Sequence, residues 1–248
     1  MKRVHLDFQD DNSMHVAEKY PKQWQIFEPF AVKYPYACLQ MDGFADEHVW
    51  VNQKLKIMTF LKESYRYCNK NFISHYILDV LNEKEFAQLK AKDNTTWIKV
   101  FKWINAIRQA LGEQQVSNLN SIAHMNLSKI AADANIRKDT PQWVLNEALQ
   151  EDGQLLYNQF KSINPNIVIC GNNFDYFLKM LKDHSATKPD VQTVFEEEID
   201  GKRPLYIYVI DGHMIVFSAY HPASNKTSED VFVKCIEENF DKLKFVIS

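Results

Sequence analysis

The chain has 248 residues, 46% of them hydrophobic and 25% charged, and its formal net charge is −3. This length allows one large or two small domains, and the composition is typical of a soluble globular protein with a sizeable apolar core. The net charge excludes an overall basic field that would attract nucleic acid, although 29 lysines and arginines can still form a local basic face. No run approaches 18 apolar residues, so no membrane span is expected.

The N-terminus and the cysteines favour a cytoplasmic protein. The first residues contain no apolar stretch of the kind that a signal peptide needs. The four cysteines (Cys38, Cys68, Cys170 and Cys235) are scattered and lack the Cys/His spacing of a zinc or iron–sulfur site. We therefore expect reduced, mostly buried thiols, no metal and no cofactor.

The first half of the chain begins with a segment of unclear periodicity. Residues 1–54 are rich in aromatic residues and proline, and we expect an irregular N-terminal extension packed on a core domain of residues 55–248. A short strand is expected at residues 55–61. The clearest helix pattern covers residues 97–111, where apolar residues recur at helical spacing. A second strand is expected at residues 122–127.

The next elements alternate in type. Thr140 as N-cap and Pro141 at the first helical position predict a long helix that ends before Asn164-Pro165. Ile167 to Cys170, closed by Gly171, reads as a buried parallel strand. Another helix is expected near residues 174–181.

The chain then predicts a hairpin and a last helix. Strands 205–210 and 213–218 flank Asp211-Gly212, which is typical of a two-residue turn. The last helix is expected to start near Thr227 or Ser228 and to bury Val231, Phe232, Ile236 and Phe240. Helices that alternate with short apolar strands predict an α/β fold with a short, mostly parallel central sheet covered on both faces.

Three of the expected strands end in polar side chains. Glu63 follows the first strand, Asn126 lies at the end of the second, and His221 follows the last. The carboxyl ends of parallel strands meet at one edge of a sheet, where open α/β sheets bind ligands. An acid, an amide and an imidazole are therefore expected to face one cleft.

These three segments resemble the motifs of the uracil-DNA glycosylase-like superfamily. The segment from Phe60 to Arg66 is similar to the superfamily's loop Gly-Gln-Asp-Pro-Tyr-His, with Ser64 in place of the proline. Asn126 matches the asparagine that reads the base. The segment from His221 to Lys226 is similar to the loop His-Pro-Ser-Pro-Leu-Ser, with Ala223 in place of its first serine.

The resemblance implies a three-layer α/β/α sandwich and a monofunctional DNA glycosylase, in which water attacks the sugar of a flipped-out base. Glu63 would position the water and His221 would stabilise the departing base. Base contacts would come from Asn126, Tyr65 and Phe72. DNA contacts would come from Lys62, Arg66, Lys129, Ser224, Asn225, Lys226 and Ser228. The expected partner is DNA, with no membrane and no metal; protein partners are unknown.

Several alternatives stay open. The substrate is uracil or another damaged pyrimidine, or a hypermodified cytosine of phage DNA, which would make the enzyme antiviral. A catalytically inactive DNA-binding relative is a third possibility. A hydrolase of small nucleosides is a fourth, although no Gly-x-Ser-x-Gly or Walker-type motif occurs. Structural roles also compete: Glu63 as a solvated carboxylate, Asn126 as a turn residue and His221 as a surface histidine.

Overall fold

A computed structural model describes residues 21–34, 39, 42–62, 95–114, 119–130, 141–196, 205–222 and 229–247. The described elements are α2 (Pro21–Lys33), β1 (Gly43–Phe44), α3 (Glu47–Val51), β2 (Ile57–Leu61), α5 (Thr95–Ala110), η2 (Leu119–Ser121), β3 (Ala123–Asn126), α6 (Gln142–Ile163), β4 (Ile167–Gly171), α7 (Phe174–His184), β5 (Val191–Glu196), β6 (Tyr206–Ile210), β7 (Met214–Ala219), α8 (Glu229–Glu238) and α9 (Phe240–Ile247).

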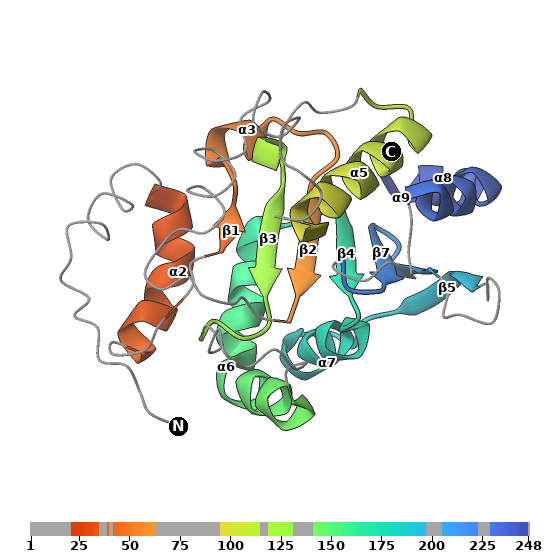
Figure 1. The fold of residues 1–248 in the computed structure, drawn as a ribbon. Coiled ribbons are helices and arrows are strands. Elements are labelled where there is room, and N and C mark those ends of the chain that lie inside the picture. Colours follow the sequence, from red (N-terminus) through yellow and green to blue (C-terminus); the bar gives the residue numbers. More distant parts are fainter. Residues whose placement is uncertain are drawn as a thin grey trace.

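The strands form one mixed sheet in the order β1-β3-β2-β4-β7-β6-β5 (Figure 1). The four central strands β3, β2, β4 and β7 are parallel. β1 pairs antiparallel with β3, β6 pairs antiparallel with β7, and β5 pairs antiparallel with β6. The predicted α/β class with a parallel sheet centre is therefore confirmed.

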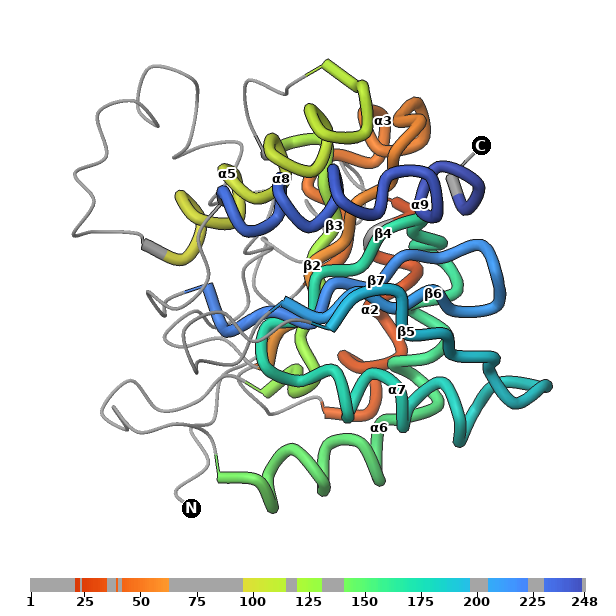
Figure 2. Tube along the Cα trace, turned by 90° about the vertical axis from the view of Figure 1, so that its right-hand side faces the viewer, coloured from red at the N-terminus to blue at the C-terminus, as the bar shows by residue number. Residues whose placement is uncertain are grey.

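Helices pack on both faces of this sheet (Figure 2). Helices α5 and α8 lie on one face, and α6 and α7 lie on the other. Side chains of β4 alternate between the two apolar clusters, since Ile167 and Ile169 face the first while Val168 and Cys170 face the second. All five residues of β4 are buried, as its continuous apolar sequence predicts.

The expectation of irregular structure in residues 1–54 is wrong for the part of that segment that the structure describes. Residues 21–33 form helix α2, which buries Phe27 and Phe30 in the second cluster. β1 adds a strand to the sheet beside β3. Pro29 lies inside α2, and a proline within a helical pattern ordinarily argues for a break, which hid the helix in the sequence.

Two boundaries also differ from the sequence prediction. Pro141 occupies the N-cap position of α6 instead of its first turn; Thr140 lies outside the described residues. Ile210 pairs with Met214, so the hairpin loop has three residues instead of two, although Asp211 and Gly212 adopt the left-handed φ values of 53° and 68° that the turn requires.

The C-terminal helix is divided in two. The helix is interrupted at Asn239, and α9 then begins at Phe240. The side-chain Nδ2 of Asn239 donates to the carbonyl of Cys235 at 3.0 Å. Phe232 and Ile236 are buried as expected, whereas Val231 and Phe240 are only half-buried. The predicted start of this helix, at Thr227 or Ser228, lies outside the described residues.

Candidate functional site

The four parallel strands end at one level. Leu61 of β2 pairs with Asn126 of β3, Phe60 pairs with Cys170 of β4, and Gly171 pairs with Ala219 of β7. The chain leaves β2 for β3 on one side and later returns to β4 on the other. A ligand site is therefore expected around the carboxyl end of β2, because open α/β sheets bind ligands where the strand order reverses.

Three predicted site residues lie at this edge. Asn126 is the last residue of β3 and is buried, Lys62 follows β2 directly and is half-buried, and His221 lies two residues after β7 and is half-buried. A fourth, Lys129, follows β3 and is buried, and the other eight lie outside the described part of the chain: Glu63, Tyr65, Arg66, Phe72, Ser224, Asn225, Lys226 and Ser228.

The side-chain amide of Asn126 is buried and makes no hydrogen bond to the part of the chain that the structure describes. The residue is 1% exposed, and neither Oδ1 nor Nδ2 has a partner among those residues. Burying an amide in this way costs about 1–3 kcal/mol, so native structures rarely retain one without a purpose. An adjacent donor and acceptor held ready at a strand end can bind the edge of a heterocyclic base.

A second unpartnered amide, Asn173, was not anticipated from the sequence. It lies two residues after β4 and is 2% exposed, and within the described ranges Oδ1 and Nδ2 have no hydrogen-bond partner. Asn173 occupies the N-cap position of α7 but makes no capping hydrogen bond, although asparagine is a favoured cap. The ends of β3 and β4 are two strand spacings apart, about 10 Å. The sequence feature that could have indicated Asn173 is Gly171-Asn172-Asn173, a polar turn between a buried strand and a helix.

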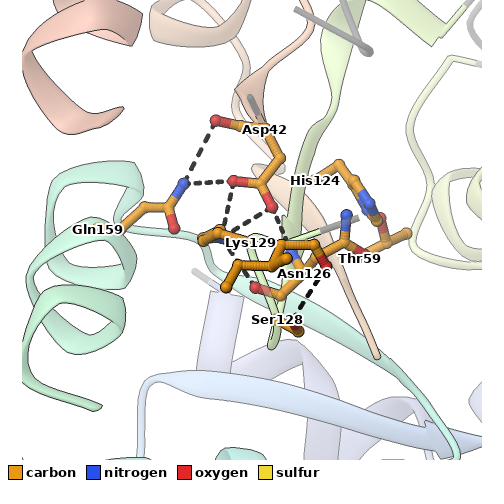
Figure 3. Close-up of polar contacts among 8 residues, drawn as sticks. Asp42, Thr59, His124, Asn126, Ser128, Lys129 and Gln159 are labelled. Carbon is orange, nitrogen blue, oxygen red and sulfur yellow. Dashed lines mark hydrogen bonds and ion pairs between the residues drawn. The ribbon is translucent and has the colours of Figure 1, made fainter. Parts of the chain in front are cut away.

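Lys129 belongs to a buried network (Figure 3). Its Nζ lies 2.8 Å from both carboxylate oxygens of Asp42, and both side chains have 0% exposure. Gln159 Nε2 also donates to Asp42, at 2.7 Å. The ring centroid of Phe30 lies 5.3 Å from Nζ. The described contacts of this ammonium are all internal, and the predicted contact of Lys129 with a DNA phosphate stays a prediction.

The same network holds the main chain of Asn126. Asp42 accepts a hydrogen bond from the Asn126 N–H at 2.5 Å, and Lys129 Nζ donates to the Asn126 carbonyl at 2.8 Å. Burial lowers the pKa of Lys129, and the neighbouring carboxylate of Asp42 acts in the opposite direction. Sequence inspection missed Asp42 because it comes from the N-terminal segment.

His124 lies next to this network. Its Nδ1 is 2.8 Å from Thr59 Oγ1, and its ring packs edge-on against Trp97. Burial lowers the pKa of His124 to about 4; Asp42 raises it, while the positive charges of Lys129 and His221 lower it further. Asn126 lies close enough to influence this pKa, although no hydrogen bond of normal geometry joins the two side chains. A neutral imidazole is therefore expected at pH 7.

The low pKa of His124 predicts a loss of stability in mild acid. The unfolded chain binds a proton near pH 6.5 but the folded chain only near pH 4, so stability falls as pH decreases through this window. His124 alone is expected to lower the free energy of unfolding by about 2–3 kcal/mol between pH 7 and pH 4.5. Urea denaturation at pH 7 and pH 4.5 measures the loss, and His124→Gln should show a smaller one. Equal losses in the two proteins would contradict the assignment.

Gly171 allows the turn of His221 to approach β4. A Cβ at position 171 would lie 2.5 Å from Leu61 Cδ2 and 3.2 Å from Pro222 Cδ. Gly171→Ala is therefore expected to destabilise the fold by about 1–3 kcal/mol through overpacking, as measured by urea denaturation. Adding Leu61→Val removes the obstructing Cδ2 and should recover part of the loss. A Gly171→Ala variant as stable as the wild type would show that the turn moves aside freely.

No group of three or more potential metal-ligating residues occurs among the residues that the structure describes. Every helix in the same set is too short or too polar to serve as a membrane span.

The chain matches no protein-family model and no curated protein sequence.

Proposed function

We propose that this protein is a monofunctional DNA glycosylase of the uracil-DNA glycosylase-like type, with that superfamily's three-layer α/β/α architecture. It would hydrolyse the N-glycosidic bond of a flipped-out damaged or modified pyrimidine and leave an abasic site. The observation that carries the proposal is the unpartnered amide of Asn126. It lies at the end of the strand to which the resemblance assigns the base-reading asparagine.

Two further features support the proposal. The central strands run in the order β3-β2-β4-β7 with the switch point beside Asn126, so a ligand at this edge would reach its amide. His221 follows strand β7, and a positive charge on it would lower the pKa of His124 within β3. An amide that reads a base and an imidazole that can donate to it therefore lie at the same edge.

The proposed reaction uses Asn126 and His221 together with the carboxylate of Glu63. Glu63 would orient a water molecule whose oxygen bonds to the sugar C1′, and it would accept the water proton. The glycosidic electron pair leaves with the base, which develops negative charge. A hydrogen bond from His221 to a carbonyl of the base would stabilise that charge, an effect worth about 100-fold or more in rate. Asn126 would hold the base edge throughout.

A glycosylase assay on a panel of DNA substrates tests the proposal. The panel contains uracil, hydroxymethylcytosine and glucosylated hydroxymethylcytosine, and alkali cleavage of abasic sites provides the readout. We expect cleavage of at least one substrate by the wild type and none by Glu63→Ala or His221→Ala. DNA binding without cleavage of any substrate would contradict an enzyme and favour a non-catalytic DNA-binding protein.

A further inference from the structure

We propose that Asp42 and Lys129 are positioning residues, which fix the main chain of Asn126 at the place from which its amide reads the base. This inference rests on the proposed function. Two observations carry it: Asp42 accepts from the N–H of Asn126, and Lys129 donates to the carbonyl of the same residue. The side chain of Asn126 makes no hydrogen bond to any described residue, so these main-chain bonds hold it in place.

The pair meets the main-chain groups of Asn126 on the side of the sheet that faces β1. The N–H of Leu127 points toward β2, since it donates to the carbonyl of Leu61. Successive residues of a strand direct their main-chain groups to opposite sides, so those of Asn126 point toward β1. Among the described residues, β1 pairs with β3 through Gly43 and Phe44, and Asp42 comes directly before this strand. The carboxylate of Asp42 and the ammonium of Lys129 bind the main chain of Asn126 on this side.

Opposite charges give this arrangement a single orientation. A carboxylate can only accept and an ammonium can only donate, and each meets the complementary main-chain group of Asn126. Charge-assisted hydrogen bonds of this kind are stronger than neutral ones. A buried ion pair adds little net stability compared with apolar residues of similar size, so fixing Asn126 is the role that best accounts for it here.

Two double variants separate positioning from stability. Asp42→Leu/Lys129→Met removes both main-chain contacts, whereas Asp42→Asn/Lys129→Met keeps an acceptor oxygen for the Asn126 N–H and for Gln159. Neither leaves an unpaired charge in the interior, so both are expected to fold. On the substrate that the wild type cleaves, we expect kcat/KM to fall by about 100-fold in the first variant and by less in the second. Discrimination against unmodified cytosine should weaken in the same order.

An NMR measurement tests the geometry without any need for activity. The Asn126 amide proton, bonded to a carboxylate, should resonate far downfield and exchange slowly in the wild type. In Asp42→Leu/Lys129→Met it should move upfield and exchange faster, and in Asp42→Asn/Lys129→Met it should shift less. His221→Ala is the control, because it changes the same edge of the sheet without touching these contacts, and it should leave this resonance in place.

The outcomes distinguish the two proposals. A wild-type protein that cleaves no substrate contradicts the proposed function, while the NMR comparison still decides whether the Asp42–Lys129 pair fixes Asn126. An Asn126 amide with unchanged shift and exchange in the folded double variants overturns the inference. The inference is also overturned if the double variants keep the wild-type kcat/KM and the wild-type discrimination against unmodified cytosine. If the leucine variant fails to fold, the asparagine variant alone carries the comparison.

Discussion

Replacing Lys129 with methionine is expected to lower the free energy of unfolding by about 3–5 kcal/mol. The substitution removes the ammonium and leaves the carboxylate of Asp42 buried at 0% exposure, where it still accepts from Gln159 and from the Asn126 N–H. A buried charge that loses a counter-ion loses much of the compensation for its desolvation cost. Urea denaturation followed by circular dichroism measures the change.

Lys179→Met is the matched control for this substitution. Lys179 also pairs with an aspartate, Asp183, but the two side chains are 59% and 44% exposed. Removing an exposed pair costs about 0.5 kcal/mol or less, so this variant should remain close to the wild type. A Lys129→Met protein within about 1 kcal/mol of the wild type would contradict a charged Asp42 in a dry interior.

Replacing Asn126 with alanine is expected to abolish most activity and to leave the fold intact. We expect kcat/KM on the cleaved substrate to fall by about 100-fold or more, since a polar contact to the reacting base is lost. Stability should stay unchanged or increase, because the variant no longer buries an amide without partners. The measurements are the glycosylase assay and urea denaturation of the same preparations.

Asn239→Ala provides the opposite result and serves as the control. Asn239 is also a buried asparagine, but its amide donates to the carbonyl of Cys235 between α8 and α9. Its replacement should cost about 1 kcal/mol of stability and leave kcat/KM unchanged. If Asn126→Ala instead loses stability and retains activity, its amide has a structural role and base reading must be assigned elsewhere.

Local sequence patterns predicted the part of the fold that is built from short-range signals. The apolar runs at β2, β3 and β4 were found because a buried parallel strand is recognisable from its own residues. The polar residue at the end of β3, Asn126, and His221 after β7 could then be placed at one edge. This reasoning works because the carboxyl ends of parallel strands must meet.

The network around Lys129 could not be predicted in this way. In the sequence, Lys129 follows a serine after a strand, which is typical of an exposed loop. Its burial depends on Asp42, which lies 87 residues earlier and reaches Lys129 only because β1 joins the sheet beside β3. A two-residue strand has no pattern that sequence analysis can detect. Asn173 was missed for a different reason, since an asparagine before a helix is ordinarily read as a cap.

The Asp42 network also constrains the order in which the protein can fold during synthesis. Asp42 contacts Gln159 across 117 residues and Lys129 across 87, so the carboxylate gains these partners only after most of the chain has left the ribosome. Contacts of such long range form slowly, because the intervening loop must close before they contribute. The sheet edge around Asn126 is therefore expected to form late, after local helices have formed, and a nascent chain that stops before α6 would have no Gln159 to complete the network.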